Sequence, residues 1–175
     1  MKTFLSRYDT VVGALTRGAG VIAGGLVMAV CFMIVYEIVA RGIFHSPTEW
    51  VTEISTYCIV VSGFLGMGAT WAGKKHIRVD ILTVHLAPRT QCFLEILTSI
   101  FVLCFCYLFV TESWGMAMLS LAYDNCAPTT LSTPLWIPQI SMPIGMGIMA
   151  LQVIGTILHD AARLLSQDFG KEETA

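Results

Sequence analysis

Few side chains in this sequence have the types and spacing that chemistry requires, and they lie in or beside long apolar stretches. Glu37 and Arg41 are four residues apart, so a helix places them on one face. This spacing fits a carboxylate that couples proton movement to transport, or an ion pair that ends a membrane span. We favour the ion pair, because Glu37 lies near the end of its stretch. Glu112 is followed by apolar residues up to Leu121, so we expect it to face a partner or Arg41.

The histidines and cysteines do not predict a redox or metal site. A membrane haem needs histidine ligands within the spans, and all four histidines lie outside them, which argues against the anchor of a redox enzyme. Their spacing does not match a metal site, so no metal or cofactor is expected. The cysteines include no Cys-x-x-Cys pair, and we interpret them as small apolar packing residues without a disulfide. The histidines and cysteines are His45, His76, His85, His159, Cys31, Cys58, Cys92, Cys104, Cys106 and Cys126.

Four long stretches contain no Asp, Glu, Lys, Arg or His. They cover residues 18–36, 54–73, 96–111 and 125–158. A transmembrane helix needs about 20 mostly apolar residues. The chain has 175 residues, of which 13% are charged, whereas soluble domains have about 25%. We therefore predict an all-α integral membrane protein with four transmembrane helices, no room for a globular domain of typical size and no nucleic-acid surface.

The stretches and their flanks predict one membrane domain with further helical segments. Residues 2–17 have apolar side chains at helical spacing, which predicts an amphipathic helix in the headgroup plane. Gly18 to Gly20 would then turn the chain into the first span, which is retained rather than cleaved as a signal. The polar tail 166–175 is expected to be disordered. The expected spans are about 19–40, 51–72, 93–121 and 134–158.

The start of the last span and the segment before the third carry specific signals. Thr133 is expected to cap the last span, with Pro134 at its first helical position and kinks at Pro138 and Pro143. In segment 77–89, the apolar residues fall on two nearly opposite sides of a helical wheel. We expect a short interfacial helix between lipid and another protein surface; the alternative is an irregular loop. The residues of the two sides are Ile77, Ile81 and Val84 on one, and Val79, Leu82 and Leu86 on the other.

Lysine and arginine are distributed unevenly across the predicted loops. Nine of the ten lie at the N-terminus, in the second loop or in the tail, and only Arg41 lies in the first or third loop. Cytoplasmic loops carry the excess of basic residues, so both termini and the second loop are expected in the cytoplasm. The second span also repeats small residues every four positions, at Ser62, Gly66 and Thr70, which lets helices approach closely. Contact with a partner and contact within this chain both remain open.

Six short strings carry a family resemblance, at residues 41–53, 64–69, 76–82, 88–89, 134–138 and 142–145. In this order and spacing, they resemble the small membrane subunit of tripartite ATP-independent periplasmic (TRAP) transporters. Two departures from the family pattern occur around the second span. Paired acids and an Arg-Tyr are common there, and this chain has Thr52-Glu53 and Thr56-Tyr57; a Trp common in the middle of that span is absent from residues 59–62.

The resemblance implies a heteromeric transporter of the bacterial inner membrane. In this family a periplasmic binding protein captures a substrate, usually an organic acid. A large many-span subunit moves the substrate with sodium. The small subunit, which this chain resembles, is a fixed scaffold that holds the large one and helps present a docking surface, so no enzyme activity is implied.

The residues themselves agree with this division of labour, because ion-coupled transport needs buried ionisable groups near the midplane. The alternative is a self-sufficient small proton-coupled exporter that acts as an oligomer and uses Glu37 or Glu112. Contacts with the large subunit are expected from Ser62, Gly66, Thr70, Lys74, Lys75, His76, Ile77, Arg78 and Asp80. Contacts on the periplasmic side are expected from Arg41, Glu49, Trp50, Glu53 and Glu112.

Overall fold

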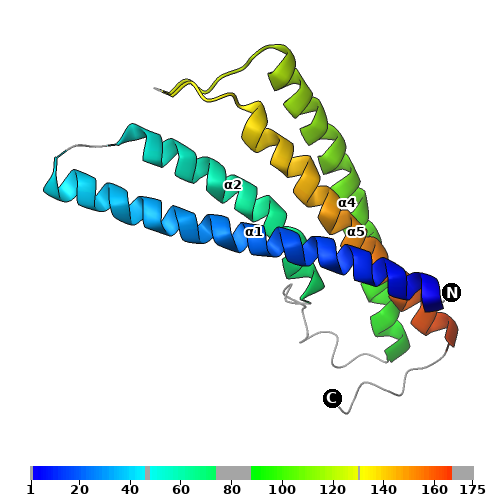
Figure 1. Ribbon diagram of the computed structural model, residues 1–175. Coiled ribbons are helices and arrows are strands. Elements are labelled where there is room, and N and C mark those ends of the chain that lie inside the picture. The colour runs from blue at the N-terminus through cyan, green and yellow to red at the C-terminus, as the bar shows by residue number, and fades with distance from the viewer. Residues whose placement is uncertain (1, 46–47, 74–87, 130, 167–175) are drawn as a thin grey trace.

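The computed structural model describes residues 2–45, 48–73, 88–129 and 131–166, and these form four long helices (Figure 1). All four are long and apolar enough to cross a membrane. The described residues contain no strand, only an isolated bridge between Cys126 and Pro134. The predicted all-α architecture with four apolar helices is therefore confirmed. The helices are α1 (Lys2–Ile43), α2 (Glu49–Ala72), α4 (Pro88–Ala122) and α5 (Trp136–Ser166).

Helix α1 is much longer than the predicted first span. Its 42 residues run without interruption, which corresponds to about 63 Å at 1.5 Å per residue. The turn expected at Gly18–Gly20 is wrong. Gly20 serves packing instead, because a Cβ there would lie 2.9 Å from the Cβ of Ala69 in α2. Placement of residues 2–17 in the headgroup plane stays a prediction.

The other helix ends differ from the predicted ones by a few residues. Helix α4 begins at Pro88, five residues before the expected span. Helix α5 begins at Trp136, so Thr133 and Pro134 do not start it; Pro134 pairs with Cys126 in the bridge instead. Pro138 lies in the first turn, where a helix leaves its N–H groups unpaired anyway. Pro143 lies inside the helix. Residues 77–87 and 167–175 lie outside the described residues.

The four helices form two hairpins that meet at one end and diverge toward the other (Figure 1). Helix α1 packs on α2, and α4 packs on α5. Helix α5 also contacts α2 and the beginning of α1, which makes it the central helix. We call the end where the hairpins meet the hub end, and the end with connections 44–48 and 123–135 the loop end.

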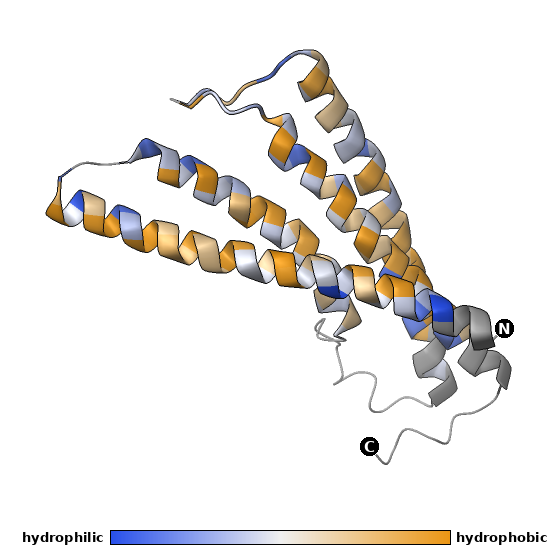
Figure 2. Ribbon diagram, viewed as in Figure 1, coloured by the Kyte–Doolittle hydropathy of each residue, from blue (hydrophilic) through white to orange (hydrophobic). Residues whose placement is uncertain are grey.

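The α1–α2 hairpin is joined along a seam with heptad spacing. On α1, the buried residues Thr16, Ala23, Val30 and Glu37 recur every seven positions, with others between them. A repeat of this kind keeps two helices in contact along their length. Small residues of α2 lie against this seam, since Ala69 lies next to Gly20 and Gly66 lies next to Ala23, so the backbones come close. Figure 2 shows apolar residues along most of the coloured part of α1, so hydropathy alone does not reveal this seam.

Close contacts also join α5 to its neighbours. Toward α4, Met146, Met149 and Val153 of α5 surround Cys106 in the apolar core. Toward α2, a Cβ at Gly145 would lie only 2.4 Å from the carbonyl oxygen of Phe64. Only glycine permits this approach, so the two hairpins are held together by backbone contact.

Polar side chains hold α1, α2 and α5 together at the hub end. The amide of Gln152 donates to the hydroxyl of Thr16 (2.7 Å), and the indole N–H of Trp71 donates to the hydroxyl of Thr156 (3.1 Å). The hydroxyl of Tyr8 donates to a backbone carbonyl of α5 (2.7 Å). In hydrocarbon such groups must find protein partners. We call these five residues the hub.

Candidate partner interface

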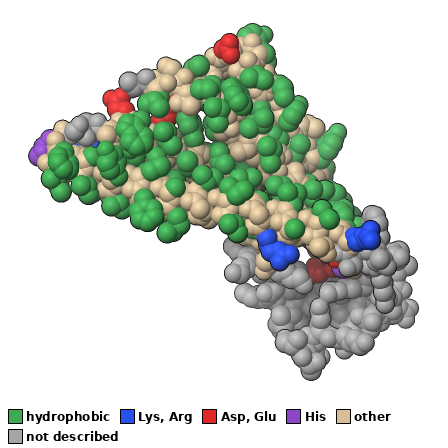
Figure 3. Space-filling model, in the orientation of Figure 1, with side chains coloured by type: hydrophobic (Ala, Val, Ile, Leu, Met, Phe, Trp, Pro, Cys, Tyr) green, Lys and Arg blue, Asp and Glu red, His purple; other side chains and the backbone are tan. Residues whose placement is uncertain are grey.

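Helices α1 and α4 present long apolar faces that the rest of the described chain does not cover. On α1, Val21 is 76% exposed and Phe32 is 69% exposed; on α4, Phe101 is 78% exposed. Figure 3 shows hydrophobic side chains spread over the visible face of both hairpins, among backbone and polar side chains. In a membrane these faces meet either lipid or another membrane protein, which makes them the candidate partner interface.

Glu37 connects α1 to the start of α2 at the loop end. Its carboxylate accepts from the guanidinium of Arg41 (2.9 Å) and from the backbone N–H of Thr48 (3.2 Å), and also contacts the Thr48 hydroxyl. The Glu37 side chain is only 12% exposed, whereas that of Arg41 is 66% exposed. The interpretation as an i,i+4 ion pair is therefore confirmed. Since Arg41 pairs with Glu37, it is not the partner of Glu112.

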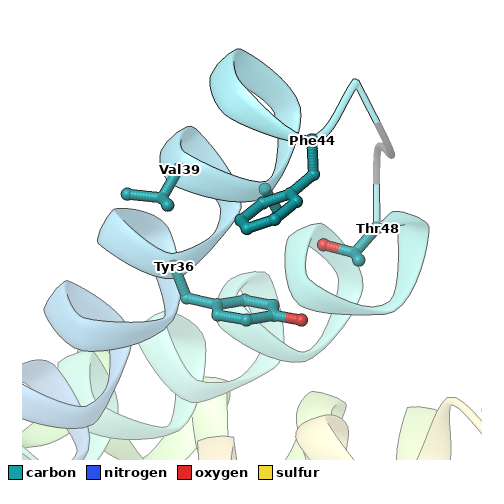
Figure 4. A pocket seen from close by; sticks show the side chains of 5 residues that line it. Tyr36, Val39, Phe44 and Thr48 are labelled. Atoms are coloured by element: carbon teal, nitrogen blue, oxygen red, sulfur yellow. The ribbon is translucent and has the colours of Figure 1, made fainter.

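A small hollow of about 290 Å³ lies beside this ion pair (Figure 4). It is lined by Tyr36, Val39, Ala40, Phe44 and Thr48. The polar side chains of the lining are those of Tyr36 and Thr48, and the other three are apolar. The hollow suits apolar packing at the loop end.

A second polar cluster joins the two hairpins at the loop end. The carboxylate of Glu53 accepts from the hydroxyl of Tyr57 (2.9 Å), one helical turn along α2. It also hydrogen-bonds Thr129 and Thr133, which belong to the α4–α5 connection. The sequence indicated a contact for Glu53 on this side of the membrane. It did not indicate that the contact lies within the chain, because threonine hydroxyls give no charge signal.

Two of the small residues in α2 pack within the chain. Ser62 is buried, and its hydroxyl donates to the carbonyl of Ile59 (2.9 Å). A Cβ at Gly66 would lie 3.8 Å from that of Ala23 in α1. Ser62 and Gly66 therefore have contacts within this chain, and contact of either with a partner stays a prediction. Thr70 is exposed, and its contact with a partner stays a prediction as well.

The remaining predicted contact residues divide into two groups. Arg41, Glu49, Trp50 and Glu112 are exposed. The others lie outside the described residues: Lys74, Lys75, His76, Ile77, Arg78 and Asp80.

The described cysteines and histidines play different structural parts. Cys106 is fully buried in the α4–α5 core, as a packing residue should be. Cys31 and Cys104 are exposed, so the packing role does not extend to them within this chain. His159 lies 2.7 Å from the carboxylate of Asp9 and joins α5 to α1 near the hub. From the sequence, His159 was considered as a haem or metal ligand, and its pairing with Asp9 was not predicted.

Three known proteins are similar to this chain. A TRAP transporter small permease protein of Haemophilus influenzae is 27% identical over 146 residues, which cover 82% of this chain and 83% of that protein. The isethionate TRAP transporter permease protein DctMQ of Oleidesulfovibrio alaskensis is 24% identical over 73% of this chain. The sialic acid TRAP transporter permease protein SiaT of Haemophilus influenzae is 26% identical over 51%. The matches cover only 21% and 14% of these two longer proteins.

Residues 20–163 match the DctQ component of tripartite ATP-independent periplasmic transporters. The match spans all four helices and most of the chain, and the four-helix architecture agrees with it. The resemblance drawn from the short strings is thereby confirmed. The chain belongs to the DctQ family, the small membrane permease subunits of TRAP transporters.

Proposed function

We propose that this subunit is a non-catalytic scaffold in a sodium-coupled, binding-protein-dependent secondary transporter for an organic acid. It holds a large transport subunit in the bacterial inner membrane and helps dock the periplasmic binding protein. The two longer relatives support a large membrane partner, because in each of them the segment similar to this chain is part of a much longer permease polypeptide. Their names give isethionate and sialic acid, which are both organic acids.

One observation carries the proposal: several polar side chains of the described spans bind the helices or their ends to one another, while wide apolar faces stay uncovered. Glu37 is held by Arg41 and Thr48, and Gln152 is held by Thr16. Ion-coupled translocation usually relies on broken helices and on free ionisable groups near the midplane. The four described helices are continuous, and their polar contacts suit a rigid body rather than a moving gate.

The orientation is proposed from charge. Arg7 and Arg17 lie at the end where α1 begins, where basic side chains are prominent in Figure 3. At the loop end, Arg41 is accompanied by the acids Glu37 and Glu53. The excess of basic residues marks the cytoplasmic side. We therefore place the hub end and both termini in the cytoplasm, the loop end in the periplasm, and membrane lipid against the faces that the partner leaves free.

Copurification tests the scaffold. Tagged chain extracted in mild detergent should carry a much larger multi-span protein with it, and vesicles with this subunit alone should not transport. The exporter alternative predicts transport by the purified chain alone, abolished by Glu37→Gln. The described contacts of Glu37 speak against Glu37 as the coupling group of that exporter, since its carboxylate is already bound on two sides. Recovery of the chain without a larger partner would overturn the scaffold proposal.

A further inference from the structure

Glu112 lies in an unusual place for a carboxylate. It is exposed on α4, and the described residues offer it no hydrogen bond or ion pair. It belongs to one helical face, since the spacing of three and four residues aligns its neighbours above and below it. Those neighbours, all more than half exposed, are Phe105, Leu108, Met116 and Leu119. We call these five residues the Glu112 face.

The position of Glu112 along α4 allows two locations for the membrane boundary. In both of them, Glu112 or its apolar neighbours need a protein partner. The helix continues for ten residues beyond it to Ala122, or about 15 Å. If the membrane reaches the end of the helix, an exposed carboxylate stands in hydrocarbon, which is costly. If the membrane ends at Glu112, then Met116 and Leu119 stand in water as part of an exposed apolar patch, which usually marks a binding surface.

The charge of Glu112 indicates the chemistry of the partner. Lipid tails can cover the apolar neighbours, but they cannot pair with a carboxylate. An apolar helix that presents an arginine or lysine side chain satisfies both parts of the face at once, because its apolar residues cover Leu108 and Leu119 while its cation meets Glu112.

A second copy of this chain fits the face poorly. A two-fold dimer through this surface would place the same residues of both copies against each other. Two Glu112 carboxylates would then approach, and like charges in a dry interface repel. Of the lysine and arginine residues that the structure describes, the one at the loop end is Arg41, which is already bound to Glu37.

We propose that the Glu112 face is the docking surface for a transmembrane helix of the large subunit, and that this helix presents a basic side chain to Glu112. The inference rests on the proposed scaffold function and adds to it the recognising residue and its charge. Glu112 acts here in recognition and has no part in moving the substrate.

Photo-crosslinking distinguishes the Glu112 face from the rest of α4. A photoreactive amino acid at Leu119 should crosslink the tagged chain to the large subunit, whereas the same group at the adjacent Met118 points about 100° away and should not. Leu108 and Tyr107 form an equivalent pair of positions on α4, about three helical turns before Leu119. Crosslinks from Met118 and Tyr107 but not from Leu119 and Leu108 would overturn the proposal, and so would a crosslinked dimer of this chain or crosslinks to lipid alone.

Charge variants test the basic partner. Glu112→Gln keeps the volume and should reduce the recovered complex about tenfold, Glu112→Lys should abolish it, and Glu112→Asp should retain part of it. Thr111→Ala is a matched control, because Thr111 is also exposed but bonds carbonyls of its own helix. If the wild-type chain and the Glu112→Gln variant recover equal amounts of the large subunit, the proposal for Glu112 is wrong and the scaffold proposal stands. If wild-type chain recovers none, the scaffold proposal fails with it.

Discussion

Gly145 is the position at which a single methyl group tests the packing most directly. A Cβ there would lie 2.4 Å from the carbonyl oxygen and 2.8 Å from the Cβ of Phe64. The carbonyl belongs to the backbone of α2, so it cannot rotate away as the tip of a flexible side chain would. Gly145→Ala should therefore force the two hairpins apart.

The size of the effect follows from this geometry. Ordinary contact begins at 3.4 Å, so the α2 and α5 backbones must separate by about 1 Å near Gly145. Separation also loosens the ring contact between Phe64 and Phe109, whose centroids are 5.7 Å apart. Overpacking of this kind costs about 1–3 kcal/mol. We expect Gly145→Ala to lower the free energy of unfolding by about 2 kcal/mol, or roughly 30-fold in the folding equilibrium.

Reversible unfolding in mixed micelles, titrated with SDS and followed by circular dichroism, measures this loss. Gly147→Ala is the matched control, because it lies on the same helix and a Cβ there would meet nothing within 4 Å. Its free energy of unfolding should stay within about 0.5 kcal/mol of wild type. Equal stability of both variants, or equal losses in both, would refute the argument that backbone contact at Gly145 joins the hairpins.

Three further predictions concern the hub, the ion pair and the orientation. Gln152→Leu removes the hydrogen bond to Thr16 and should lower the free energy of unfolding by about 1 kcal/mol in the same titration; unchanged stability would contradict the role of the hub. Glu37→Gln should lower the thermal stability and the yield of the complex, but uptake per complex should hold; uptake lost at full yield would restore Glu37 as a coupling group. In variants with one cysteine each, a membrane-impermeant maleimide in the periplasm should label Cys126 but not Cys104; Cys126 labelled only after cell lysis would reverse the orientation.

The features that the sequence predicted correctly are local ones. A membrane helix satisfies its backbone hydrogen bonds within itself, so a long uncharged stretch is sufficient to identify it. The pairing of Glu37 with Arg41 is local as well, since four residues along a helix bring the two side chains together whatever surrounds them. Helix existence and this ion pair therefore needed no knowledge of which helices are neighbours.

The errors occurred where a distant residue decides the outcome. Glycines at positions 18 and 20 suit a turn, and they equally suit a helix in close contact with another helix. Gly20 has the second role, because it lies in close contact with Ala69. The residues near Gly20 in the sequence do not predict this contact. The same holds for Pro134. The sequence predicted it at the start of the last helix, but it forms a bridge with Cys126 on the other side of the connection.

The small and polar residues of the spans indicate which helices are neighbours. Hydropathy does not indicate this, because it is uniform along the spans. Thr16 and Ser62 lie in contacts between helices, as do Gly145 and Cys106. Many large apolar residues point outward, unlike in a soluble protein, because lipid and partner helices impose no penalty on them. A carboxylate on the outward side does not fit this rule, and so Glu112 indicates where another protein, rather than lipid, must meet the chain.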